Sequence, residues 1–141
     1  MLGIEKVSGK EPWESFLGKS SFFICIKRLI DVNGEFNALS FFYVSGDKFG
    51  KLFKLQATDL DGMYMRTLLQ SRFGTQTLRV VEELTCDVMP DDVCQELGLA
   101  PGSAGMVFHI MSYGYRDEPV YYHLVFVPPN KRRLEIRENL A

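Results

Sequence analysis

The sequence is poor in the residues that build metal sites and disulfide frameworks. It has three cysteines, Cys25, Cys86 and Cys94, and two histidines, His109 and His123, in 141 residues. The cysteines are odd in number and none stands at a CxxC or Cys/His ligand spacing, so the usual zinc motifs are missing. We therefore expect three buried, reduced thiols of a cytoplasmic protein, and neither a metal nor another cofactor.

The chain also lacks long apolar runs, a basic excess and the common catalytic motifs. No apolar run approaches 18 residues, and the N-terminus has no signal-peptide core, so we predict no membrane segment. The net charge is −2 and the pI is about 5.7, whereas a domain that grips nucleic acid usually has a pI above about 9. There is no GxSxG, HExxH, Walker loop or GxGxxG. These absences argue against a DNA-binding surface on this chain and against an enzyme.

Two segments of similar pattern each predict a β-hairpin. Residues 24–48 align with residues 107–131 without a gap, at a shift of 83 positions. In this alignment the turn Asn33-Gly34-Glu35 falls on Arg116-Asp117-Glu118, and Val44 falls on Val127. Two hairpins separated by helical segments indicate one antiparallel α+β sheet built from two similar halves. A crevice between such halves is a natural ligand site.

The remaining elements follow from helix stops and apolar spacing. We predict a tail or linker over residues 1–10 and a single domain over 11–141. Between the hairpins we expect one helical turn at 51–53, a helix from Asp59 or Asp61 to about Arg72 with Tyr64, Leu68 and Leu69 buried beside Met65, and a strand over 78–86. Shorter helices are expected at about 12–17 and 90–97, and an edge strand is possible at about 134–136. The predicted order is α-ββ-α-β-α-ββ.

A few polar residues stand where they could bind a ligand. Arg28 lies in the apolar stretch FFICIKRLI beside Lys27, and adjacent strand residues point to opposite faces. One of the two should therefore face inward, and the residues alone leave open which. Tyr64, close to the free N–H groups of a helix start, could help to hold a carboxylate or phosphate, although a core tyrosine is the simpler alternative. For His109 and His123 a structural or pocket-lining role is favoured over catalysis.

With these residues in view, the chain resembles the UTRA domain, the effector-binding half of GntR-type bacterial transcription regulators of the HutC subgroup. Leu97-Gly98-Leu99, Pro101-Gly102 and Pro119-Val120 match the family pattern in the second half. In the first half, Ile26-Lys27-Arg28-Leu29 resembles the strand that carries the family's Arg-Leu-Arg motif. Asp61-Gly62-Met63-Tyr64 resembles its Ser-Leu-Tyr helix start, and Arg72-Phe73-Gly74 its Tyr-Gly stop. The likeness covers residues 13–136 and implies the chorismate lyase-like α+β fold.

The resemblance also implies a binding site, with changes. Sugar-phosphate-binding members use both arginines of Arg-Leu-Arg, the serine and tyrosine of Ser-Leu-Tyr, and a glutamate on each return strand. Here Arg28 and Tyr64 are kept, whereas other residues stand at the four remaining positions, which are Ile30, Gly62, Ser40 and Tyr121. Together with His123 they form the expected ligand site. Since a second arginine and two charged acceptors are missing, we expect a less polar carboxylate effector with an aromatic or aliphatic body.

The resemblance further implies a homodimer that meets DNA only through an N-terminal winged-helix domain absent from this chain, and it implies no membrane partner. Two alternatives remain open. One is a dimerisation module that binds no ligand. The other is a chorismate lyase-like enzyme that eliminates pyruvate from an aromatic precursor. The enzyme is disfavoured because the glutamate expected for proton chemistry is found neither at Ser40 nor at Tyr121.

Overall fold

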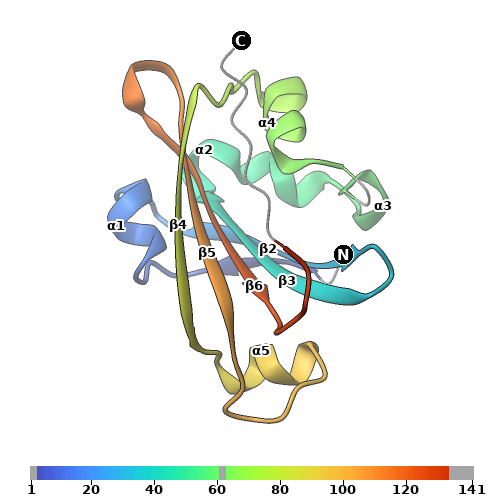
Figure 1. The fold of residues 1–141 in the computed structure, drawn as a ribbon. Coiled ribbons are helices and arrows are strands. Elements are labelled where there is room, and N and C mark those ends of the chain that lie inside the picture. Colours follow the sequence, from blue (N-terminus) through green and yellow to red (C-terminus); the bar gives the residue numbers. More distant parts are fainter. Residues whose placement is uncertain (1–2, 61–62, 134–141) are drawn as a thin grey trace.

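The computed structural model describes residues 3–60 and 63–133. Within them the chain forms one six-stranded antiparallel sheet in the order β1-β2-β3-β6-β5-β4 (Figure 1). The strands are β1 (Gly3–Val7), β2 (Phe23–Val32), β3 (Phe36–Ser45), β4 (Arg79–Val88), β5 (Ala104–Tyr113) and β6 (Pro119–Val127). All neighbouring strands are antiparallel. The predicted α+β class and both predicted hairpins are therefore confirmed.

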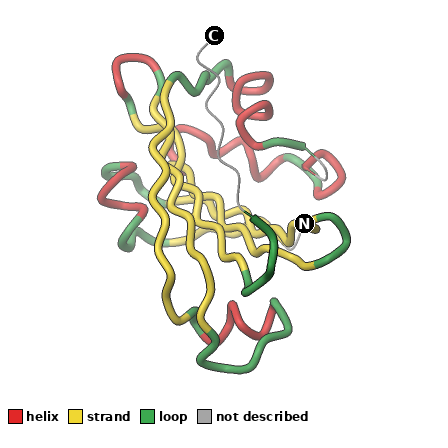
Figure 2. The backbone as a smooth tube through the Cα atoms, viewed as in Figure 1, coloured by secondary structure: helices red, strands yellow, loops and turns green. Residues whose placement is uncertain are grey.

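Short helices surround the sheet, which forms the twisted central layer in Figure 2. The α-helices are α1 (Trp13–Leu17), α2 (Gly46–Phe49), α3 (Ala57–Leu60), α4 (Met65–Phe73) and α5 (Asp91–Glu96), and the 3₁₀ helices are η1 (Gly50–Lys54) and η2 (Tyr115–Asp117). Helix α4 ends as its sequence predicts. Gly74 adopts φ 64°, and its N–H donates to the Gln70 carbonyl, which is the left-handed stop that glycine permits.

The two hairpins are related as the sequence repeat predicts, with one correction. Phe42 of β3 and Val125 of β6 are equivalent at a shift of 83. Their partners on the outgoing strands are Ile26 and Phe108, which differ by 82. The gapless alignment is therefore wrong by one residue on β5. The second hairpin takes up this residue in its longer turn, where the pairing of β5 with β6 also shifts beside Ser112.

A pseudo-two-fold axis passes through the centre of the sheet. Phe41 of β3 pairs with Leu124 of β6, and Leu124 is the residue equivalent to Phe41 at the shift of 83. The strand order is symmetric about this pair, with β3 opposite β6, β2 opposite β5 and β1 opposite β4. Each half also carries a helix between its first two strands, α1 in one half and α5 in the other. The repeat therefore extends beyond the hairpins to a strand and a helix before each of them.

The two faces of the sheet bury separate cores. We call one the α4 face, because Ile26 and Phe42 pack there under Leu60, Leu68 and other residues of the segment from α2 to α4. The opposite face is covered by α5, through residues such as Val93, and by α1, through Leu17. Figure 1 shows α2, α3 and α4 together on one side of the sheet, apart from α1 and α5. On the α4 face, the segment from α2 to α4 therefore covers residues of both halves of the sheet.

The structure corrects several expectations about single segments. Gly3–Val7, expected to be part of a tail or linker, form strand β1 and pair with β2. The helix expected from about residue 59 to 72 is divided into α3 and α4. Tyr64 is not in the buried stripe of that helix, since it precedes α4 and is 81% exposed, whereas Met65, Leu68 and Leu69 are buried as predicted. The possible edge strand at 134–136 lies outside the described residues.

The cysteines are also only partly as expected. Cys25 and Cys94 are buried free thiols, and burial raises the pKa of the Cys25 thiol to about 12. Cys86, expected to be buried, is exposed because it lies on the edge strand β4. In the described part of the chain, no helix has the length and apolar character to cross a membrane.

Candidate functional site: a pocket between α4 and the sheet

A pocket of about 440 Å³ lies between the start of α4 and the α4 face of the sheet. Its floor comes from strands of both halves, and one wall comes from the first turn of α4. The lining residues are Arg28, Ile30, Ser40, Phe42, Tyr64, Met65, Arg66, Thr67, Glu82, Ile110, Tyr121 and His123. The pocket therefore lies in the crevice between the two halves, which is where the sequence repeat predicts a ligand site.

The structure brings most of the predicted site residues together around this one pocket. Six of them line it, namely Arg28, Ile30, Ser40, Tyr64, Tyr121 and His123. The seventh, Gly62, lies outside the described residues. Arg66 and Glu82 are the charged lining residues that the sequence reasoning missed. Arg66 could have been found from its place two positions after Tyr64, once the helix is taken to start there.

The alternation of β2 decides between the two neighbouring cations. Arg28 pairs with Ser40 on the α4 face, and its half-buried side chain lines the pocket. Lys27 points to the opposite face, where its Nζ lies 3.1 Å from a carboxylate oxygen of Glu96 in α5. It also lies over the ring of Phe41. Arg28 is therefore the cation that faces the pocket, and Lys27 serves the packing of α5.

The pocket floor contains an uncharged polar pair that crosses the pseudo-two-fold axis. Ser40 and His123 are equivalent at a shift of 83, and Ser40 Oγ lies 2.5 Å from His123 Nε2. Ser40 is only 2% exposed. Burial, and then the positive charge of Arg28, lower the pKa of His123 from 6.5 to about 4. The imidazole is therefore neutral at pH 7, and it leaves Arg28 as the positive charge of this part of the floor.

A second guanidinium enters from α4. Arg66 stands in the first turn of the helix, and its Nη2 donates to the hydroxyl of Tyr121 at 3.4 Å. Within residues 3–60 and 63–133, the backbone N–H groups of Met65, Arg66 and Thr67 have no hydrogen-bond acceptor. Such N–H groups, together with the helix dipole, favour an anion at a helix start. Positive potential therefore comes from both the floor and the wall of the pocket.

The other walls are apolar and restrict what can bind. Phe42 and Ile110 rise from the two halves of the sheet, and Ile30 is 37% exposed beside Arg28. Glu82 on β4 is the single carboxylate among the described lining residues. No group of three or more potential metal ligands occurs in the described part of the chain. The arrangement suits a small molecule with one anionic end and an apolar body.

Several solved structures have the same fold as this chain. The chain is similar to the C-terminal domain of Yurk from Bacillus subtilis subsp. subtilis str. 168, with a TM-score of 0.80 and 17% identity over 90% of this chain and 86% of that chain. It is similar to a GntR-family transcriptional regulator from Enterococcus faecalis V583, with a TM-score of 0.78 and 8% identity over 97% of each chain. The effector domain of PhnF from Mycobacterium smegmatis gives a TM-score of 0.75 and 13% identity over 89% of this chain and 76% of that chain.

These structures share the chorismate lyase-like α+β fold, as predicted. At such low identities they establish the fold alone, and no curated protein sequence matches the chain. The family follows from the sequence instead, because the UTRA domain pattern matches residues 16–133. The chain therefore belongs to the UTRA domain family.

Proposed function

We propose that this UTRA domain binds a small anionic effector in the pocket between α4 and the sheet, as the sensing part of a cytoplasmic GntR-type transcription regulator. The observation that carries the proposal is the convergence of Arg28 and Arg66, from two different elements, on one pocket with apolar walls. Guanidinium groups beside the N–H groups of a helix start are a recurrent way to hold a carboxylate or phosphate. Two of the structural relatives, described as a GntR-family regulator and as an effector domain, support a regulatory role.

The pocket chemistry favours a carboxylate with an aromatic or aliphatic body over a sugar phosphate. Ser40 and Tyr121 stand where the family's sugar-phosphate binders carry glutamates, so charged acceptors for sugar hydroxyls are missing there. Ile30 replaces the second arginine of the strand motif, and Arg66 offers one guanidinium from the opposite wall. Phe42, Ile110 and Ile30 would pack against the body of the effector.

The proposal includes the homodimer that the family resemblance implies, in which effector binding would reposition a DNA-binding domain joined to this one. Sedimentation of the domain over a range of protein concentrations tests the dimer. The pocket itself is tested separately, because a dimerisation module with no ligand would have the same mass in solution.

The decisive experiment is a thermal-shift screen of the wild-type domain and the Arg28→Ala variant. The panel contains aliphatic and aromatic carboxylates, amino acids and sugar phosphates. A ligand at 100 times its dissociation constant should add about 2.7 kcal/mol to the free energy of unfolding, which raises the melting temperature by several degrees. Arg72→Ala is the matched control, since Arg72 is exposed at the far end of the same helix and does not line the pocket.

The expected result is a shift by one or more carboxylates that Arg28→Ala abolishes and Arg72→Ala keeps. A shift by sugar phosphates alone would overturn the proposed effector class. No shift from any compound would favour the ligand-free dimerisation module, whereas release of pyruvate from a cyclohexadienyl enol-pyruvyl ether, with an aromatic acid as the other product, would favour the lyase.

A further inference from the structure

A second concave surface, distinct from the effector pocket, lies on the same face of the sheet at the end away from α4. This groove has a volume of about 500 Å³. Its walls come from the β2–β3 turn, from β4 and β5, and from the segment that follows β6. The lining residues are Val32, Asn33, Phe36, Cys86, Ala104, Gly105, Met106, Phe108, Val127, Pro128, Pro129, Asn130, Arg132 and Arg133. Most of these residues are apolar. Because exposed apolar surfaces of this kind usually mark an interaction site, we ask which segment or partner covers the groove.

The pseudo-two-fold axis shows what covers the equivalent surface in the first half. Met106 and Phe108 of β5 correspond to Ile24 and Ile26 of β2 at the shift of 82, and Val127 corresponds to Val44 at the shift of 83. Ile24, Ile26 and Val44 are 0% exposed, whereas the three groove residues are only half-buried.

The cover in the first half is the piece of chain that directly follows the return strand. Phe49, Leu52 and Leu60, from the segment after β3, are buried in one cluster with Ile24, Ile26 and Val44. At the shift of 83, the segment after β6 is the sequence counterpart of this cover in the second half. That segment already forms part of the groove, through Pro128 and the residues up to Arg133.

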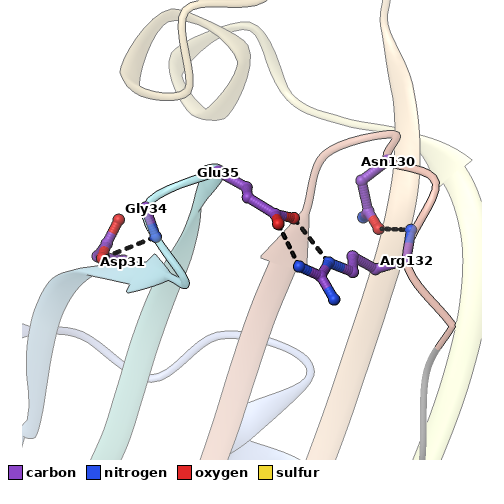
Figure 3. A network of polar contacts seen from close by, with 5 residues as sticks. All are labelled: Asp31, Gly34, Glu35, Asn130 and Arg132. Atoms are coloured by element: carbon purple, nitrogen blue, oxygen red, sulfur yellow. Dashed lines mark hydrogen bonds and ion pairs between the residues drawn. The ribbon is translucent and has the colours of Figure 1, made fainter.

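Polar contacts tie this segment to the β2–β3 turn, as Figure 3 shows. The Arg132 guanidinium donates to both carboxylate oxygens of Glu35, with Nε at 2.7 Å from Oε2. The Arg132 N–H donates to Asn130 Oδ1 at 2.9 Å, which holds the chain in a turn. Glu35 belongs to the β2–β3 turn, which Asp31 supports by accepting the Gly34 N–H. These contacts hold the chain at the groove up to Arg133, which is itself a lining residue.

We propose that the groove is the docking site of residues 134–141 of the same chain. Their sequence, LEIRENLA, offers Leu134, Ile136 and Leu140 as apolar groups for the Met106, Phe108 and Val127 surface. At the shift of 83, Leu134 falls one position before the equivalent of Leu52, which covers the first half. Residues that are tied to the groove by their own backbone have a high effective concentration there, which favours them over a free partner.

Cys86 supplies a probe for this contact, because it lines the groove and is exposed among the described residues. Cys25 and Cys94 are 2% and 0% exposed. Reaction with a thiol reagent such as 5,5′-dithiobis(2-nitrobenzoate) therefore reports on the groove. We expect Cys86 to react about tenfold or more faster in a chain ending at Arg133 than in the full chain. The peptide LEIRENLA, added in excess, should slow the reaction of the shortened chain again.

Two full-length variants keep the test decisive if the shortened chain fails to fold. Replacement of Leu134, Ile136 and Leu140 by serine keeps the length and should also expose Cys86. In Ile136→Cys, mild oxidation should join the new thiol to Cys86 within one chain. Equal reaction rates in the full and serine-substituted chains, or the absence of that disulfide, would overturn the proposal. Protection of Cys86 that rises with protein concentration in both chains would instead identify a second copy as the occupant.

Discussion

His123 stands out among the individual residues because the fold holds it in one protonation state. Its pKa is about 4 in the folded chain, through burial and the nearby Arg28, and near 6.5 in an unfolded chain. At pH values between about 4 and 6.5, the unfolded state binds more protons at His123 than the folded state does. The stability that neutral His123 contributes is therefore complete above about pH 6.5 and is lost as the pH falls toward 4.

This difference predicts a pH effect on folding. Between pH 7 and pH 5 the wild-type domain should lose on the order of 2 kcal/mol of unfolding free energy through His123. His123→Gln, which keeps a polar group beside Ser40 but cannot take up a proton, should lack that loss. Urea unfolding at both pH values measures it. His109→Gln is the matched control. It should still lose the unfolding free energy that arises from His123 between pH 7 and pH 5. An equal loss in wild type and His123→Gln would contradict the assignment.

Single residues also show which parts of the pocket could be predicted from the sequence and which could not. Arg28 was identifiable because a charge inside an apolar strand needs an explanation, and β-alternation left only Lys27 as the rival. Arg66 was missed because the helix was expected to start at Asp59 or Asp61. That placement put Tyr64 in the buried stripe, whereas the chain starts a new helix after Tyr64 and turns Arg66 toward Tyr121. The observed start carries no capping signal, because the N-cap residue Tyr64 makes no side-chain capping hydrogen bond, whereas Asp59 and Asp61 are residues that often cap helices.

At the level of whole elements, the hairpin strands were well predicted because long apolar runs end at turn residues. Strand β1 was missed since its five residues, GIEKV, alternate too weakly to reveal a strand. Its pairing comes from the edge of β2, and such non-local pairing leaves little trace in a short sequence. The one-residue offset between β2 and β5 was equally hidden, because the apolar residues 23–26 of β2 and 106–108 of β5 occupy both faces and fit either register.

The close approach of β5 and β6 makes a prediction about one position. A Cβ on Gly105 would lie 2.6 Å from the Val127 carbonyl oxygen and 2.8 Å from Met89 Sδ. Gly105→Ala should therefore lower the unfolding free energy by roughly 1–3 kcal/mol, because the backbone oxygen cannot move away without disturbing β6. Gly3→Ala is the control, since a Cβ there meets nothing within 4 Å. Urea unfolding of both variants measures the difference, and equal midpoints would contradict the argument.

At the scale of the whole molecule, the two pseudo-symmetric halves share their cores. On the α4 face, Ile24 and Phe42 of the first half are buried in one cluster with Val120 and Tyr121 of the second. On the opposite face, Leu39 of the first half packs with Val93 and Val107 of the second. The central strands β3 and β6 pair across the axis. Neither half can bury its apolar surface without the other, so the repeat does not divide the chain into two folding units.

The domain should therefore unfold in a single cooperative transition. Trp13, the only tryptophan, stacks on Tyr43 with ring centroids 4.2 Å apart, so its fluorescence reports on the packing of α1. Leu39→Ala removes a fully buried side chain from the α5 cluster, which is a different cluster from the one that contains Tyr43. It should cost roughly 2–5 kcal/mol.

Because unfolding is cooperative, this loss should shift the Trp13 fluorescence transition and the far-ultraviolet circular dichroism transition by the same amount in urea. The control is the wild-type domain, in which the two transitions should coincide. A Trp13 transition that stays at its wild-type midpoint while the circular dichroism transition moves would show that α1 and its strands fold apart from the rest. Since both clusters contain residues of both halves, that outcome would contradict the shared core and the single cooperative transition.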